Sequence, residues 1–151
     1  MSKLLDWAMM IVANEESARE LSRIGIGVST ARHTNIIEFK NVVLAPEGSM
    51  TIIDITGSGS VDECLIISLS PDVALSIIAD DVLIFDKNFN DALEVSQELI
   101  FLSAFVKEED SQMFYVYHVK GIDFVKNVNI TVSNTSDSEI TIKHAICKYS
   151  Q

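Results

Sequence analysis

The chain has 151 residues, the size of one domain with room for a short additional segment. Hydrophobic residues make up 48%, enough for a real core, and 22 acids against 11 Lys plus Arg give a net charge of −11. An acidic surface without clustered Lys and Arg argues against nucleic acid and anionic membranes as partners. No apolar stretch approaches the ~20 residues that span a bilayer, and no signal-peptide pattern opens the chain. We therefore expect a soluble, unprocessed protein.

Residues 1–27 differ from the rest of the chain and predict an amphipathic helical segment. Ser2 can cap the start of the helix, and Gly25 and Gly27 end it. Two interpretations remain open: the helix packs on its own domain, or it bundles between subunits with Asn14 setting the register. The candidate oligomer interface is the set of residues at alternating spacings of three and four, namely Leu4, Trp7, Ile11, Asn14, Ala18 and Leu21.

Residues 28–35 form a polar connector, and residues 36–151 form a β-rich domain. Short runs of β-branched and aromatic residues recur there, separated by turn signals such as Pro46-Glu47-Gly48 and Asp80-Asp81. The last two runs flank a polar turn at 134–138, which is typical of a β-hairpin. The predicted strands cover residues 36–45, 49–56, 61–69, 73–79, 82–86, 99–107, 112–120, 123–133 and 139–149.

One segment, residues 90–98, interrupts the β pattern. Asn90 can act as a helix cap, and Leu93 and Gln97 have helical spacing, so we predict one short helix within a long connection. Strands at this spacing with such a crossover favour a sandwich over a parallel α/β fold. The predicted fold class is mainly β: an antiparallel jelly-roll-like β-sandwich with an N-terminal α-helix and one short helix in a crossover loop.

The residues that carry chemistry in other proteins form no complete motif here. The segment from Asp86 to Asp91 copies the opening of a calcium loop, but it lacks the glycine at the sixth position and the glutamate at the twelfth. His118 and His144 lie in predicted strands and have no evident third ligand. No serine elbow, phosphate loop or Cys-x-x-Cys pair is present. We therefore predict no catalytic, cofactor-binding or metal-binding residues, and the protein is not expected to be an enzyme.

The two cysteines and two tyrosines leave alternatives open. Cys64 and Cys147 lie in apolar strands, where buried thiols are the default, and a bridge between them remains open. Alternation sends Tyr115 and Tyr117 to one face of their strand. That face is either a wall of the core, which we favour, or an exposed platform on which a glycan stacks. A glycoside hydrolase, which needs one carboxyl group in an apolar pocket, ranks third.

Three segments, residues 52–61, 73–84 and 124–149, together resemble the small jelly-roll modules of bacteriophage structural proteins. In those modules a Gly-rich turn opens a strand, as at Gly57-Ser58-Gly59-Ser60 here. An aliphatic strand then ends in an Asp-Gly-like hairpin, where this chain has Asp81 in place of glycine. The last two strands form a hairpin around an Asn-Thr-Ser turn, here Asn134-Thr135-Ser136. The resemblance covers about residues 42–149.

The resemblance implies an assembly role and supplies no catalytic residue. Modules of this kind are tail-, baseplate- or capsid-associated, and they often form trimers with an N-terminal helical segment. The expected function is therefore that of a virion component acting through protein–protein contacts, with itself and other virion proteins as partners. It would be found in the virion, or in the host cytoplasm during assembly. A carbohydrate- or ligand-binding module is the alternative, with a glycan as the partner.

Overall fold

The computed structural model describes residues 33–151 of the chain. This part contains nine β-strands, which form two antiparallel sheets, and one short α-helix. The fold is therefore mainly β, as predicted, and its first strand begins two residues before the predicted start at residue 36. The predicted helix within residues 1–27 lies outside the described residues.

The elements follow one another with short connections. The strands are β1 (Thr34–Leu44), β2 (Ser49–Thr56), β3 (Gly59–Ser68), β4 (Val73–Ala79), β5 (Val82–Asn88), β6 (Leu102–Glu109), β7 (Gln112–Phe124), β8 (Asn127–Asn134) and β9 (Ile140–Ser150). Between β5 and β6 lie the helix α1 (Phe89–Val95) and a 3₁₀ turn (Ser96–Glu98). The connection from β5 to β6 is thus the one that carries a helix, as the sequence predicts.

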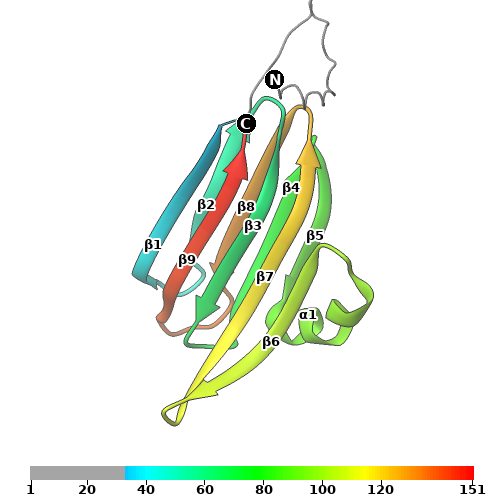
Figure 1. Ribbon diagram of the computed structural model, residues 1–151. Coiled ribbons are helices and arrows are strands. Elements are labelled where there is room, and N and C mark those ends of the chain that lie inside the picture. Colours follow the sequence, from blue (N-terminus) through cyan, green and yellow to red (C-terminus); the bar gives the residue numbers. More distant parts are fainter. Residues whose placement is uncertain (1–32) are drawn as a thin grey trace, which may run out of the picture. The chain divides into compact units, whose positions relative to one another are not determined.

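The strand pairs are nested like those of one long hairpin. Strand β1 pairs with β9, β2 with β8, β3 with β7 and β4 with β5, all antiparallel. Two further pairings, β3 with β9 and β4 with β8, bring the folded ribbon together into sheets. The resulting strand orders are β1-β9-β3-β7-β6 and β2-β8-β4-β5, and Figure 1 shows the two sheets as facing layers.

The core lies between the two sheets because alternate side chains of each strand, most of them apolar, point inward. In β8 the alternation is complete: Val128, Ile130 and Val132 are fully buried, and the residues between them are partly exposed. Each such buried side chain contributes about 1.5–3 kcal/mol through removal from water. The alternate residues of each strand form the outer faces of the two sheets.

Most predicted strand boundaries agree with the structure to within two residues, and the largest difference lies between β7 and β8. The sequence predicts a break near Gly121, but β7 continues through it to Phe124. Gly121 has φ 72°, so it allows a local irregularity within the strand and does not end it. The chain reverses four residues later, at Val125 and Lys126. The helix also differs: it begins at Phe89 and not after Asn90.

The reversal after β7 is held by the hairpin between β4 and β5. Asp80 and Asp81 have φ 53° and 65°, as a two-residue turn of the type I′ requires, which confirms the predicted tight hairpin. The Asp80 carboxylate accepts hydrogen bonds from the backbone N–H groups of Val125 (2.9 Å), Lys126 (2.6 Å) and Asn127 (3.2 Å). One side chain thus fixes two turns at the same end of the sandwich.

The same hydrogen bonds lower the pKa of Asp80, with the Lys126 N–H as the largest cause. A carboxyl group whose pKa is lowered by folding adds stability above its unfolded pKa of about 3.9, and this stability is lost as the pH falls further. We expect Asp80→Asn to be less stable than the parent chain at pH 7, with a gap that narrows below pH 4 in urea unfolding. Asp137→Asn, in the exposed turn after β8, is the charge-matched control. An unchanged gap at pH 2.5 would argue against this role.

Candidate interaction surface

The outer face of the five-stranded sheet carries apolar side chains that point away from the core. In β3, Cys64 and Ile66 are buried in the core, so Leu65 and Ile67, which alternate with them, point outward. The four residues are consecutive and apolar, which is the sequence signal that this strand is apolar on both faces. The neighbouring strands extend the band, and its members are Ile36, Leu65, Ile67, Phe105, Phe114, Val116 and Ile146.

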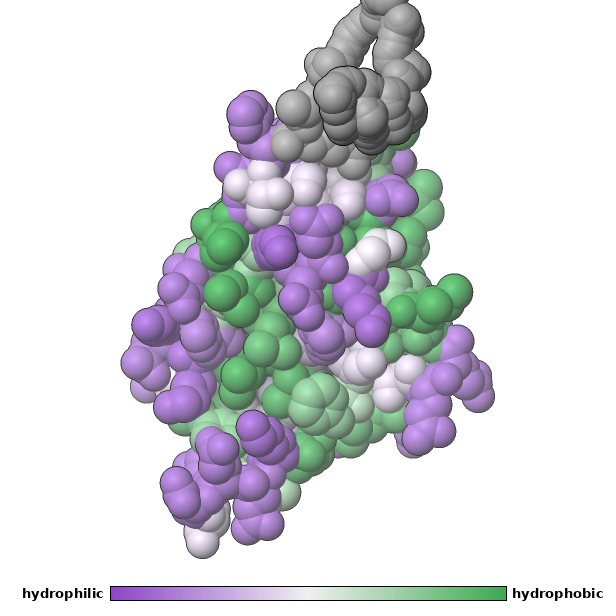
Figure 2. Space-filling view, in the orientation of Figure 1, coloured by the Kyte–Doolittle hydropathy of each residue, from purple (hydrophilic) through white to green (hydrophobic). Residues whose placement is uncertain are grey.

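The band contains a small apolar cluster of its own. Val116 is only 3% exposed, although it lies on the outer face and does not belong to the cluster between the sheets. Its neighbours in register are Ile67 on β3 and Phe105 on β6. Figure 2 shows the band crossing this face between hydrophilic margins. Apolar patches with polar rims of this kind are typical of contacts with other proteins.

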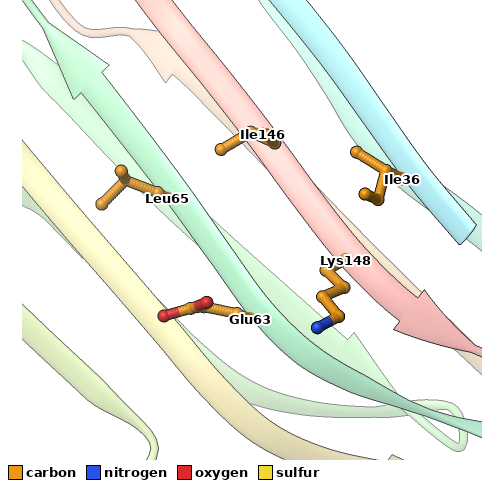
Figure 3. A pocket seen from close by; sticks show the side chains of 5 residues that line it. All are labelled: Ile36, Glu63, Leu65, Ile146 and Lys148. Carbon is orange, nitrogen blue, oxygen red and sulfur yellow. The ribbon is translucent and has the colours of Figure 1, made fainter. Parts of the chain in front are cut away.

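A shallow hollow of about 190 Å³ lies at one end of the band, between β1, β9 and β3. Ile36, Leu65 and Ile146 line it with apolar side chains, and Glu63 and Lys148 stand at its rim (Figure 3). Pockets for drug-sized ligands usually exceed about 300 Å³. The hollow therefore suits one or two apolar side chains of a partner better than a metabolite.

Two histidine–glutamate pairs flank the band. His118 Nε2 lies 2.7 Å from Glu63 Oε2 and joins β7 to β3, and His144 Nε2 bonds Glu38 Oε2 and joins β9 to β1. The two histidines do not meet, since β3 separates their strands. Within residues 33–151 no group of three His, Cys, Asp or Glu side chains has the arrangement of a metal site. The pairs thus act as cross-strand contacts, which sequence reasoning missed.

Charge is distributed unevenly over the described residues, which hold seven lysines and eighteen acids. Strand alternation and register place five of those lysines on the outer face of the five-stranded sheet, together with only five acids. The rest of residues 33–151 has two lysines against thirteen acids. The face is therefore balanced in charge on an otherwise acidic domain. Its lysines are Lys40, Lys107, Lys120, Lys143 and Lys148, and its acids are Glu38, Asp62, Glu63, Glu109 and Asp123.

The tyrosines predicted to share a face do so, and that face is the core. Tyr117 is fully buried and donates a hydrogen bond to the Val73 carbonyl at 2.9 Å. Burial raises the pKa of its hydroxyl group. Phe89 packs edge-on against both Tyr115 and Tyr117, with ring centroids 5.4 Å apart in each pair. This corrects the alternative expectation of an exposed platform for a glycan, because the Tyr117 ring is not accessible.

The cysteines face each other inside the core. Cys64 on β3 and Cys147 on β9 are direct partners in register, and both are fully buried. Their contact, together with burial, raises the pKa of Cys64, so its thiol stays protonated at neutral pH. Both cysteines are free. The buried thiol of Cys64 thus acts as a packing group in the core.

The segment that resembles a calcium loop has a structural use. The Asn88 side chain accepts a hydrogen bond from the Asp91 N–H at 2.9 Å and thus caps α1. This corrects the expectation that Asn90 is the cap. Beside it, a groove of about 460 Å³ along β5 is lined in part by Asp86 and Glu98. Both residues are exposed, whereas the acid of a glycosidase needs an apolar environment.

The candidate interface of the N-terminal segment lies outside the described residues, as do all six of its members.

Comparison of the sequence with protein-family models finds no match, and none of the curated proteins matches it either. In residues 33–151 no helix is long and apolar enough to cross a membrane. Among the described residues, the outer face of the five-stranded sheet is the most distinctive surface, because it combines an apolar band with a balance of charges.

Proposed function

We propose that the chain is a non-enzymatic structural protein that assembles with copies of itself and with other proteins. The observation that carries this proposal is the outer face of the five-stranded sheet, which is apolar and balanced in charge on an acidic domain. Net charge of one sign keeps protein copies apart, so a neutral apolar face offers the least repulsive route of approach.

The nested strand pairs support a more specific proposal, that the sandwich is a jelly roll. A jelly roll wraps a long antiparallel ribbon into two sheets of eight strands in all. Without β6, the sheet orders are β1-β9-β3-β7 and β2-β8-β4-β5. The ribbon is antiparallel: its first strand pairs with its last, the second with the second-last, and so on to the hairpin of β4 and β5. We take β6 as an additional edge strand that pairs only with β7.

A jelly roll of this size agrees with the resemblance to bacteriophage structural modules, and we propose that the protein is a tail- or capsid-associated virion component. Its place would be the virion, or the host cytoplasm during assembly. Residues 1–27 would add a helical contact between subunits, through the side chains from Leu4 to Leu21 that share one helical face.

Sedimentation velocity of the full chain tests the assembly role, and a chain lacking residues 1–27 shows how far the N-terminal segment contributes. We expect the full chain to sediment as an oligomer at micromolar concentration. If the shortened chain still associates, the sandwich holds an interface of its own. A full chain that stays monomeric across the accessible concentration range would contradict self-assembly.

A further inference from the structure

We propose that two copies of the chain pack the outer faces of their five-stranded sheets together, about a twofold axis that runs along the strands between β3 and β9. This inference rests on the proposed assembly function and names the partner, a second copy, and the surface. A twofold axis that lies in the interface plane makes the same patch meet itself. Strand β9 of one copy then faces β3 of the other, and β1 faces β7.

The centre of such an interface is apolar. Ile146 on β9 and Leu65 on β3 are direct partners in register, so they lie at the same height on either side of the axis. Ile146 of one copy therefore faces Leu65 of the second copy, and Leu65 of the first faces Ile146 of the second. Both side chains line the shallow hollow and are only partly covered in one copy. Pairing completes their burial, which is the main favourable contribution in protein association.

The charges beside this centre are complementary under the same rotation. Glu63 and Lys148 are also direct partners in register across β3 and β9. Each thus faces the opposite charge in the second copy, which yields two symmetric ion pairs. Glu38 on β1 and His118 on β7 lie at the height of the apolar centre, so they face each other across the interface as well.

An axis across the strands lacks this complementarity. If it passed through the apolar centre, each strand would meet its own counterpart with the direction reversed. Lys148 would face His144, and Glu63 would face Ile67, which lie at the two heights flanking the centre. That arrangement brings basic groups together and gives Glu63 no basic partner, whereas the axis along the strands pairs Glu63 with Lys148. The register therefore favours the axis along the strands.

The rest of the surface and the size of the face agree with a second copy as the occupant. Outside this face the described residues carry thirteen acids and two lysines, so two copies meet with least repulsion here. Strands β1, β9, β3 and β7 overlap in this arrangement. Four strands at about 4.8 Å and eight residues at about 3.3 Å give a flat area of roughly 500 Å². This is of the same order as the ~800 Å² that each partner buries in a standard interface.

Charge reversal in the full chain tests the pairing. In sedimentation velocity we expect Glu63→Lys and Lys148→Glu, each alone, to weaken dimerisation by about tenfold or more, since like charges then face each other twice. The double variant exchanges the two charges and should restore the dimer. It also keeps opposite charges side by side within each chain. Asp54→Lys, on the outer face of the other sheet, matches the charge change of Glu63→Lys and should leave dimerisation unweakened.

The outcomes separate this inference from the proposed function. Loss of association in the single variants and recovery in the double variant support the pairing, provided that circular dichroism shows all variants folded. Should Glu63→Lys not fold, Ile146→Asp, which places two carboxylates near the axis, replaces it and is expected to abolish the dimer. If the full chain associates but these variants leave association unchanged, the pairing is overturned and self-assembly stands. A monomeric parent chain overturns both.

Discussion

Replacing Asn134 with alanine is expected to lower the free energy of unfolding by about 3 kcal/mol. The side chain is 2% exposed. Its amide group donates hydrogen bonds to the carbonyls of Leu44 (3.1 Å), Ala45 (3.1 Å) and Ser138 (2.7 Å). Its oxygen accepts from the Ser136 N–H at 2.8 Å. Alanine removes these four hydrogen bonds, each of which contributes about 0.5–1.5 kcal/mol net. The Ala45 and Ser138 carbonyls keep the Gly48 N–H and the Ser136 hydroxyl as donors, so the loss is that of the bonds to Asn134 itself.

Urea unfolding of the parent chain and of two variants measures this loss. Asn129→Ala changes the same residue type in the same strand, but on the partly exposed outer face, so its effect should stay below about 1 kcal/mol. Asn134→Asp should be at least as damaging as alanine, because it sets a carboxylate against three carbonyl oxygens. Equal losses for Asn134→Ala and Asn129→Ala would show that the buried network contributes little.

Gly59→Ala is expected to destabilise the protein by a similar amount, about 3 kcal/mol. A Cβ atom at Gly59 would lie 2.2 Å from the carbonyl oxygen of Ser150 and 3.2 Å from Cα of Gln151. Both are backbone atoms, so the clash is relieved only if β3 and β9 move apart at the point where they pair. Overpacking of this kind costs about 1–3 kcal/mol in cores and more against a rigid backbone.

Gly121→Ala is the matched control for this prediction. Gly121 has φ 72°, and a Cβ atom there meets nothing within 4 Å. Its substitution costs only the strain of a left-handed backbone conformation, about 1–2 kcal/mol. Thermal and urea unfolding of both variants should therefore rank Gly59→Ala as clearly the less stable. The opposite ranking would mean that the Gly59 contact relaxes freely.

Local elements could be predicted because their signals act within a few residues. Strands β2 and β4 occupy the predicted ranges 49–56 and 73–79, where alternation is regular and turn residues flank both ends. The tight turn at Asp80-Asp81 was also predictable from its short polar break. Gly121 misled the prediction because a glycine that ends a strand and one that lies within an irregular strand have the same local sequence.

The candidate surface was much less accessible to sequence reasoning. The apolar run from Cys64 to Ile67 signals a strand that is apolar on both faces, but not which neighbours join it. The sequence marks the two histidines as candidate ligands but gives no sign of their actual partners, Glu63 and Glu38. The partners of His118 and His144 are 55 and 106 residues away in the chain. Such pairs depend on the order of strands in the sheet, which no local pattern encodes.

The sequence by itself therefore determined the β-rich class, most strand boundaries, the crossover helix and the acidic character of the chain. These follow from side-chain periodicity, turn chemistry and composition, which are properties of short segments. Only the tertiary structure decided that Tyr117 belongs to the core, that Asn134 and Asp80 hold distant turns, and that five lysines gather on one face. Each of these depends on which strands become neighbours, and that choice is made by the packing of the whole sandwich.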